Sequence, residues 1–307
     1  MTARELLAAA ARLREDVPLA PLTTYRFGGP ARYLVEAETE EDLVAAARLA
    51  AEEHLPVFVL GRGSNVVVSD RGFAGVVIRQ GTGFARRTMD RGGVISAGAA
   101  VPLPVLAREA ARAGRGGLEF FVGIPGSVGG AVRMNAGCHG TDTAEHLISA
   151  DIFDLGSCAL SVRSLTDLGL SHRHSALTDG QVVCFARFRT EPGSTQGGRV
   201  IMREISAWRK DNQPGGTFNA GSIFKNPPGD HAGRIIDALS LKGTRVGGAT
   251  VSHRHANFFV AGPGATASDL FDLVRLVRDR VLAATGIELV PEVRFVGDFG
   301  GEERRQG

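Results

Sequence analysis

Apolar and polar residues repeat with helical spacing in several parts of the chain. In residues 268–285 apolar side chains recur every three or four positions, which predicts an amphipathic helix. The same spacing predicts a short helix over residues 4–14. Thr39 is a suitable N-cap for another helix that extends to about residue 54, because acidic residues fill its first turn.

Other segments have the composition and alternation of β-strands. Residues 56–60 are a short apolar run typical of a buried strand. Residues 93–190 contain several short strands around one helix, which predicts an α+β region with a mostly antiparallel sheet. The last predicted strand covers residues 287–296, where alternation places Glu292 on the face opposite to its apolar neighbours.

Composition excludes several classes of protein. The chain has 307 residues, 43% of them hydrophobic and 22% charged, as in an ordinary globular protein. A net charge of +2, spread along the chain, does not favour nucleic-acid binding. We expect no membrane association and no signal peptide, because long apolar runs and the signal-peptide pattern are absent from the sequence. The three scattered cysteines favour a reducing, cytoplasmic location, and the histidine spacing predicts no metal site.

Glycine clusters are the first indication of a ligand. Residues 61–65 (GRGSN) directly follow a predicted strand, and their backbone amides could converge on an anion; an ordinary turn is the alternative. Residues 123–131 (GIPGSVGGA) are poor in helix and strand formers. They therefore predict an extended or turning backbone pressed against a flat or anionic ligand, and a buried loop is the alternative. Residues 135–137 (NAG) continue this pattern.

Polar residues in four other places could carry chemistry. Residues 221–227 (GSIFKNP) combine a hydroxyl, a cation and an amide, although a surface loop has the same composition. Arg173 lies in a polar stretch that a solvated loop would also explain. Glu292 could equally face solvent on the last strand, and His255 is more often a structural residue than a ligand contact.

Taken in order, these segments resemble one family, the UDP-N-acetylenolpyruvoylglucosamine reductases (the MurB family), in the shorter type that lacks a tyrosine-bearing insertion. The resemblance implies an FAD-binding fold of the PCMH type, α+β in class, with a C-terminal α+β substrate domain. It implies a first FAD subdomain over residues 1–75 joined by residues 292–307, a second over 76–192, and a substrate domain over 198–291. The segments that carry the resemblance are 24–31, 60–65, 123–131, 134–137, 213–214, 221–227, 232–234, 241–243, 251–252, 255–258 and 291–295.

The resemblance also implies an activity. Members of the family use FAD and NADPH to reduce UDP-N-acetyl-3-O-(1-carboxyvinyl)glucosamine to UDP-N-acetylmuramate for peptidoglycan synthesis. We therefore expect a small sugar nucleotide as the partner and a monomeric protein. The resemblance makes Ser222 the proton donor, Glu292 the second acid and Arg173 the cation that stabilises charge on the substrate. Glu292 would have to stay protonated near neutral pH for this role.

The family pattern assigns binding roles to further residues. The predicted cofactor contacts are Gly61, Arg62, Gly63, Ser64, Asn65, Gly123, Ile124, Pro125, Ser127, Gly129, Asn135 and Gly137. The predicted substrate contacts are Asn226, Lys225, Gln213 and His255.

The chain departs from the family pattern at several positions. Cys138 and His139 stand where Ala-Tyr is common, His172 stands where a tyrosine is common, and Asn212 replaces a frequent lysine. These differences leave two alternatives open. One is a relative that reduces a different enol ether or sugar nucleotide, and the other is an FAD-binding protein without catalytic activity.

Overall fold

The computed structural model describes residues 2–216 and 218–300, and these residues form two compact units. Unit 1 comprises residues 2–16, 32–62 and 74–209, and unit 2 comprises residues 17–31, 63–73 and 210–300 apart from 217. The chain therefore passes between the units several times, once within the first glycine cluster. The division into three domains drawn from the family resemblance stays a prediction.

The first sheet of unit 1 has four strands in the order β1-β2-β5-β3. Their bounds are Leu13–Pro18 (β1), Pro30–Ala37 (β2), Val57–Val59 (β3) and Phe73–Gln80 (β5), and β3 runs parallel to β5. Helix α2 (Glu40–Glu52) lies against this sheet and begins, as predicted, after Thr39, whose hydroxyl accepts a hydrogen bond from the N–H of Asp42. Leucines and alanines of α2 pack with valines of the sheet in one buried cluster. The apolar face of the helix therefore determines how it lies on the sheet.

The N-terminal helix is shorter than its sequence pattern predicts. Helix α1 covers Ala3–Ala9 only, and strand β1 (Leu13–Pro18) already occupies the end of the predicted helix. Ala11 has a left-handed φ of 54°, which ends the helical path. The N–H of Arg12 returns to the carbonyl of Leu7 at 2.8 Å. Pairing of β1 at the sheet edge has overridden the helical propensity of this segment.

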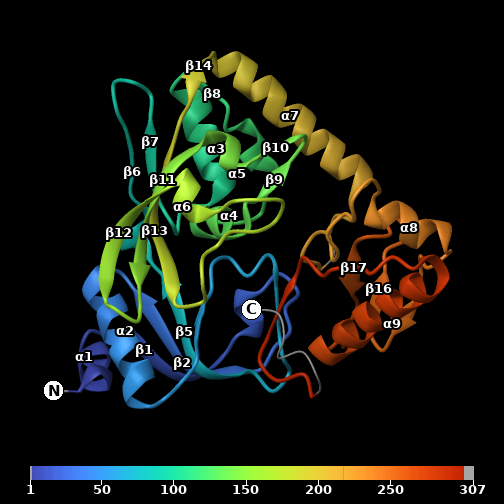
Figure 1. Ribbon diagram of the computed structural model, residues 1–307, viewed down its shortest axis with the longest axis horizontal. Helices are drawn as coiled ribbons and strands as arrows, with labels where there is room; N and C mark the ends of the chain where they lie inside the picture. The colour runs from blue at the N-terminus through green and yellow to red at the C-terminus, as the bar shows by residue number, and fades with distance from the viewer. Residues whose placement is uncertain (1, 217, 301–307) are drawn as a thin grey trace. The chain divides into compact units, whose positions relative to one another are not determined.

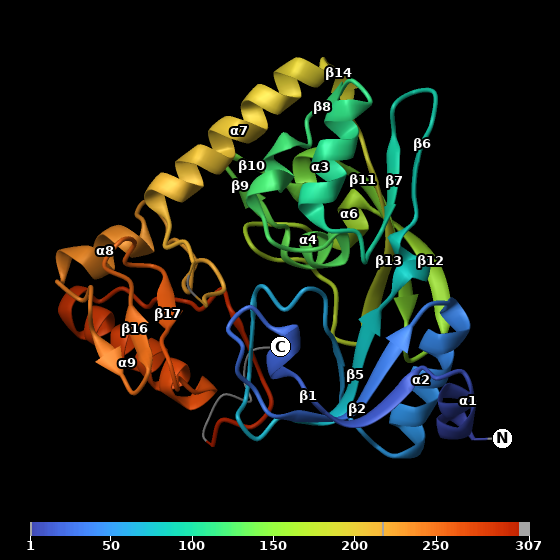
Figure 2. The ribbon, with the colours of Figure 1, turned by 180° about the vertical axis from the view of Figure 1, so that it is seen from behind.

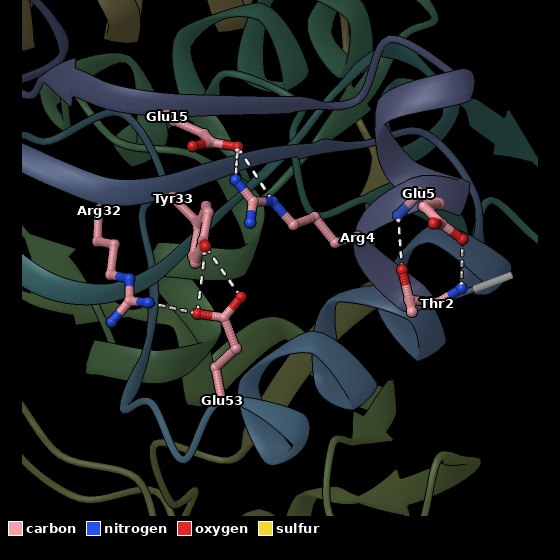
Figure 3. Close-up of polar contacts among 7 residues, drawn as sticks. All are labelled: Thr2, Arg4, Glu5, Glu15, Arg32, Tyr33 and Glu53. Carbon is pink, nitrogen blue, oxygen red and sulfur yellow. Dashed lines mark hydrogen bonds and ion pairs between the residues drawn. The ribbon is translucent and has the colours of Figure 1, made fainter.

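Polar contacts fasten α1 and the end of α2 to the sheet. Thr2 and Glu5 form a capping box at the start of α1, with bonds of 3.2 and 2.9 Å. The guanidinium of Arg4 donates to the carboxylate of Glu15 on β1 at 2.6 Å. The carboxylate of Glu53 accepts hydrogen bonds from two residues of β2, a guanidinium and a phenol hydroxyl. Figure 3 shows these contacts among Thr2, Arg4, Glu5, Glu15, Arg32, Tyr33 and Glu53.

The second sheet of unit 1 has five strands in the order β12-β11-β13-β7-β6, and the strand pairs are antiparallel. Their bounds are Arg87–Met89 (β6), Ile95–Gly98 (β7), Leu147–Asp154 (β11), Ala159–Ser164 (β12) and Gln181–Phe188 (β13). This confirms the antiparallel α+β region predicted for residues 93–190. One face packs against α3 (Leu103–Arg112) and α4 (Val128–Met134), which lie beside β11 and β13 in Figure 1. Phe153 and Cys184, on β11 and β13, belong instead to the cluster that contains α2.

Unit 2 is built around a three-stranded sheet of β15 (Arg245–Val246), β16 (Ala249–Val251) and β17 (Phe259–Ala261), in that order. Figure 2 shows α8 (Ala232–Ala238) and α9 (Ala267–Thr285) flanking β16 and β17. The amphipathic helix predicted over residues 268–285 is thereby confirmed, and its apolar face enters the buried cluster of this unit. The buried phenol of Tyr25 donates to the carbonyl of Phe259 at 2.9 Å, which attaches an N-terminal segment to the same core.

A separate pair of strands joins distant segments of unit 2. Strand β18 (Arg294–Val296) runs parallel to β4 (Val66–Val68), in the register Arg294 to Val66. Just after β4, the carboxylate of Asp70 accepts hydrogen bonds from the backbone N–H groups of Ala267 and Ser268, each at 2.9 Å. The segment that carries β4 is thus fixed both to the C-terminal strand and to the start of α9.

The remaining elements range from two to 18 residues. In the described part of the chain, no helix has both the length and the apolar character required to cross a bilayer. The elements outside these three sheets that have not been described are β8 (Arg115–Gly116), β9 (Gly137–Cys138), β10 (Thr141–Asp142), α5 (Thr143–His146), α6 (Leu165–Leu168), β14 (Glu191–Pro192) and α7 (Thr195–Asn212).

Replacing Asp70 by alanine should lower the free energy of unfolding by about 1–2 kcal/mol, because two N–H groups at the start of α9 lose their acceptor. Urea unfolding followed by circular dichroism measures the change. Asp279→Ala, which removes an exposed carboxylate from the middle of the same helix, is the matched control. Equal effects of the two substitutions would contradict the capping role of Asp70.

Candidate active site

Ser222 lies in a stretch of irregular backbone that unit 2 holds from both sides. Gly221, just before it, has a left-handed φ of 82°, a conformation that glycine adopts without steric cost. Ser222 forms an isolated antiparallel bridge with Phe258, and the next N–H, that of Ile223, donates to the carbonyl of Asn257 at 2.8 Å. The hydroxyl-bearing residue is therefore placed by backbone pairing rather than by a regular element.

Glu292 reaches the same place from the far end of the sequence. Its N–H donates to the carbonyl of Ile223 at 2.7 Å, and the preceding Pro291 forms an antiparallel bridge with Phe224. The structure thus brings Ser222 and Glu292 to neighbouring positions of two paired segments. The predicted final strand over residues 287–296 was too long, because regular pairing is confined to Arg294–Val296 and Glu292 precedes it.

Asn257, which the sequence did not single out, holds residues 221–225 in place, the stretch around Ser222 that we call the serine segment. Its side chain is 3% exposed, its Oδ1 accepts from the N–H of Phe224 at 2.9 Å, and its Nδ2 donates to the carbonyl of Phe224 at 2.8 Å. One amide therefore satisfies both polar backbone groups of a buried residue that has no regular partner strand. In the sequence it is an isolated asparagine among apolar residues, without a pattern that indicates this role.

Arg173 belongs to unit 1 and sits at the tip of a tight turn. The N–H groups and carbonyls of Ser171 and His174 pair at 3.1 Å, and Arg173 between them has a φ of 55°. Its guanidinium donates to the carbonyl of Gly137 at 2.6 Å and to that of Asn135 at 3.4 Å. The cation is thereby held directly against the residues that follow the second glycine cluster.

Asn135 connects this turn to the rest of unit 1. It is 2% exposed, ends α4 with a left-handed φ of 41°, and donates both amide hydrogens, to Asp142 at 2.9 Å and to the carbonyl of Ser171 at 3.0 Å. Its Oδ1 accepts from the N–H of Ala144 at 2.9 Å. The described contacts of this side chain are therefore structural, and a cofactor contact of Asn135 stays a prediction.

The second glycine cluster is partly helical, so the expectation of an extended or turning backbone throughout residues 123–131 was wrong. Ser127 precedes α4, whose first turn contains Gly129. The N–H of Gly129 donates to the carbonyl of Ala99 at 2.9 Å, and a β carbon on Gly129 would lie 2.9 Å from the β carbon of Ala99. Close packing of this helix on the loop after β7 therefore explains a glycine that helix propensity disfavours.

Gly61, at the start of the first glycine cluster, lies beside the second cluster within unit 1. A β carbon on Gly61 would lie 3.1 Å from the hydroxyl of Ser127, so a side chain there would fill the space beside the second cluster. Neither the first cluster nor residues 123–131 contain a carboxylate, and in unit 1 Arg62 and Ser127 add a cation and a hydroxyl donor. Such donors, together with a backbone approachable at glycine, fit the diphosphate of a dinucleotide such as FAD.

The predicted substrate contacts lie in or near unit 2's serine segment. The N–H of Lys225 donates to the carbonyl of Val290 at 2.9 Å, and Oδ1 of Asn226 accepts from the N–H of Ala232 at the start of α8. Gln213 lies just after α7. The imidazole Nδ1 of His255 accepts from the N–H of Asn257 at 3.2 Å, and its ring packs edge-on against Phe258. Their contacts with a substrate stay predictions.

Two of the unusual positions directly follow Gly137, whose carbonyl Arg173 contacts. Burial raises the pKa of the Cys138 thiol to about 11, against the opposing influence of Arg209 and Arg173, so the thiol is neutral at physiological pH. His139 packs edge-on against Trp208, with 5.0 Å between ring centres. In residues 2–216 and 218–300, no group of three or more histidine, cysteine or acidic side chains is arranged to hold a metal ion.

Comparison with known proteins gives the family. A family model described as FAD binding domain matches residues 31–157, and one described as UDP-N-acetylenolpyruvoylglucosamine reductase, C-terminal domain, matches residues 213–296. A UDP-N-acetylenolpyruvoylglucosamine reductase of Rubrobacter xylanophilus is 45% identical over 92% of this chain and 95% of the relative. The chain belongs to the UDP-N-acetylenolpyruvoylglucosamine reductase family. The predicted family and the FAD-binding α+β fold with a C-terminal domain are thereby confirmed.

Other relatives of the family agree. A reductase of the same name from Synechococcus sp. (strain WH7803) is 42% identical over 93% of both chains. The crystal structure of UDP-N-acetylenolpyruvylglucosamine reductase (MurB) from Thermus caldophilus superimposes with a TM-score of 0.80 at 40% identity, covering 93% of this chain and all of that one. The similarity therefore extends over both units.

In this member of the family, Asn257→Ala should lower the free energy of unfolding by about 2–4 kcal/mol, because the buried N–H and carbonyl of Phe224 lose their partners. Asn257→Asp keeps the shape of the side chain but sets a buried carboxylate oxygen against the carbonyl of Phe224, so it should destabilise at least as much. Urea unfolding measures both variants. Stabilities equal to that of the unmodified protein would show that the amide does not hold the serine segment.

Acidification should destabilise unit 2 through His255. Burial, followed by the nearby Lys242, lowers the pKa of His255 from its ordinary value of 6.5. Below that value the unfolded chain takes up the proton first, so the free energy of unfolding falls with pH until the folded protein is protonated as well. His255→Gln should reduce this slope, because the titrating imidazole is replaced by a neutral amide. Unfolding midpoints between about pH 5 and pH 8 test this; an unchanged slope contradicts it.

Proposed function

We propose that this chain reduces UDP-N-acetyl-3-O-(1-carboxyvinyl)glucosamine to UDP-N-acetylmuramate with NADPH and bound FAD, a step in the synthesis of peptidoglycan precursors. The observation that carries the proposal is the pairing of residues 290–292 with residues 223–225, which brings Ser222 beside Glu292 in a chain of this family. A serine and an acid at neighbouring backbone positions supply two different proton-handling groups to one reacting centre.

The glycine clusters would hold the cofactor. Gly61 to Asn65 offers backbone amides with an arginine, a serine and an asparagine, and Gly123 to Ser127 adds a second approachable backbone that meets the first at Gly61 and Ser127. When bound, FAD accepts a hydride from NADPH and later supplies a hydride to the methylene carbon of the enolpyruvyl group. The protein's task is to position the reactants and stabilise the developing charge.

Arg173 and Glu292 would stabilise that charge. Addition of hydride to the methylene carbon moves the electron pair of the double bond to the neighbouring carbon and into its carboxylate. A guanidinium and a protonated carboxyl group oppose this negative charge, and one well-placed donor contributes roughly 3–4 kcal/mol to the transition state. The backbone carbonyls of Gly137 and Asn135 orient the guanidinium for this role.

Ser222 would complete the reaction by donating its hydroxyl proton to the carbon next to the carboxylate. The product then carries one hydride and one proton more than the substrate, and the serine regains a proton from solvent. General acid catalysis of this kind typically contributes about 10²–10⁴-fold to the rate. The left-handed turn at Gly221 and the bridge to Phe258 keep the serine from relaxing into the regular structure around it.

The proposal extends to the substrate and the cellular setting. Lys225, Asn226, Gln213 and His255 would contact the sugar nucleotide, with the lysine opposing its phosphate charge. We place the protein in the cytoplasm as a monomer. Cys138, Cys158 and Cys184 are free thiols, as a reducing compartment requires.

Anaerobic half-reactions test the proposal. Purified protein should carry the absorbance of oxidised flavin, NADPH should bleach it, and the enolpyruvyl sugar nucleotide should restore it without oxygen. Ser222→Ala should leave bleaching unchanged and slow the return of absorbance by roughly 10²–10⁴-fold, because only the second half-reaction requires its proton.

Ser268→Ala, which changes an exposed serine of the same unit, is the control and should affect neither half-reaction. A bleached flavin that the substrate does not reoxidise would exclude this substrate; reoxidation by another sugar nucleotide would then identify a relative with altered specificity. Bound flavin with no sugar-nucleotide affinity by calorimetry would favour a non-catalytic FAD protein.

A further inference from the structure

The segment that carries Glu292 changes its pairing partner at that residue. Before it, Val290 accepts a hydrogen bond from the N–H of Lys225 at 2.9 Å, within the antiparallel contact to the serine segment. After it, the N–H of Arg294 donates to the carbonyl of Asn65 at 3.0 Å, at the start of the parallel pairing with β4. Glu292 therefore sits at the junction of two different ladders.

At this junction the carbonyl of Glu292 accepts a hydrogen bond from a side chain. In a continuous antiparallel ladder, the N–H of Ile223 would donate to the carbonyl of Glu292, in return for the bond that Glu292 donates to Ile223. The N–H of Ile223 donates instead to the carbonyl of Asn257 at 2.8 Å. The carbonyl of Glu292 accepts from the side-chain amide of Asn65, whose Nδ2 lies at 2.9 Å.

Asn65 is itself rigidly held, so its amide is preorganised for this contact. Gly63, two residues earlier, has a left-handed φ of 63°, and its carbonyl accepts from the N–H of Thr24 at 3.0 Å. The carbonyl of Asn65 accepts from the N–H of Arg294, and its side chain donates to the carbonyl of Glu292. Asn65 is therefore bonded to the residues on both sides of Val293. Val293 is buried at 4% exposure, which fixes the direction in which the flanking Glu292 leaves the backbone.

We infer that Asn65 is the positioning residue for Glu292: its amide fixes the backbone from which the acid reaches the substrate. The inference rests on the proposed function, in which Glu292 stabilises charge on the substrate, and differs from the cofactor contact that the family pattern assigns to Asn65. Without this hydrogen bond the backbone at residue 292 is less constrained, so the carboxyl group can move away from the substrate. A displacement of about 1 Å can cost on the order of 100-fold in rate.

Two substitutions remove the donor with different side effects. Asn65→Asp keeps the shape of the side chain but presents an oxygen to the carbonyl of Glu292, and Asn65→Ala leaves the space empty. With the flavin site saturated by added FAD, both variants should lose more rate in reoxidation than in bleaching by NADPH, because Glu292 serves only the second half-reaction. Both should slow anaerobic reoxidation by the enolpyruvyl sugar nucleotide by roughly 10–100-fold in the limiting rate, with little change in the substrate concentration at half-maximal rate.

Ser69→Ala is the matched control, because Ser69 makes an analogous bond across the same pair of segments. Its hydroxyl donates to the carbonyl of Asp298 at 2.6 Å, beyond β18 and away from Glu292. This variant should lose stability without a selective effect on reoxidation. A selective loss equal to that of the Asn65 variants would show that any weakening of the β4–β18 pair has this effect, which overturns the inference.

Hydrogen–deuterium exchange gives a readout that does not depend on the reaction. In Asn65→Ala, the backbone amide of Glu292, which donates to the carbonyl of Ile223, should exchange roughly 3- to 10-fold faster, because loss of the bond to the neighbouring carbonyl makes local opening of this segment easier. Unchanged exchange together with weakened flavin binding would show that Asn65 serves the cofactor, and would overturn the inference. If the unmodified protein is not reoxidised by the substrate, the proposed function fails, while the exchange result still reports whether Asn65 holds Glu292.

Discussion

The parallel pairing of β18 with β4 is the constraint on which the candidate active site depends. It joins residues as far apart in sequence as Asn65 and Glu292, 227 positions from one another. Closing a loop of this length is costly in chain entropy, and the cost is met by burial of Val67, Val293 and their neighbours in the core of unit 2. Because the regular pairing begins at Arg294, two residues after Glu292, the acid lies just outside the paired segment.

Irregular backbone at the site is stabilised by asparagine side chains. Asn257 satisfies both polar groups of Phe224, Asn65 satisfies the carbonyl of Glu292, and Asn135 joins the end of α4 to the turn that carries Arg173. A primary amide provides donors and an acceptor on a short side chain, so it can replace a missing strand neighbour in either direction. Each candidate catalytic residue therefore occupies a backbone position that regular secondary structure would not provide.

The sequence was sufficient to predict elements whose signal is local. The apolar spacing of α9 and the N-cap at Thr39 both identified helices that the structure contains. The glycine clusters were found for the same reason, since glycine content marks where backbone must approach something closely. Glycine content did not reveal that Gly129 lies in a helix, because the close approach is to Ala99 and that contact is tertiary.

Long-range pairing explains the other differences. The N-terminal helix is cut short because the end of its apolar pattern joins a sheet edge, and the last strand is shorter than its alternation suggests because Glu292 pairs with the serine segment first. The roles of Asn257 and Asn65 depend on which backbone groups their side chains reach in the folded chain. That property is created by the crossing of distant segments and has no counterpart in local composition.

Cys138, which stands where the family pattern has alanine, lies near Arg173, and its protonation bears on the role proposed for that guanidinium. In the proposed function Arg173 opposes the charge of the substrate carboxylate, and a thiolate at position 138 would neutralise part of the guanidinium charge. Burial prevents this, because it raises the pKa of the Cys138 thiol to about 11 although Arg209 and Arg173 both favour the charged form. The thiol therefore stays neutral, and the full charge of Arg173 remains directed by the carbonyls of Gly137 and Asn135. The substitution changes shape and polarizability near the cation, so its consequences should appear in substrate fit more than in stabilisation of the developing negative charge.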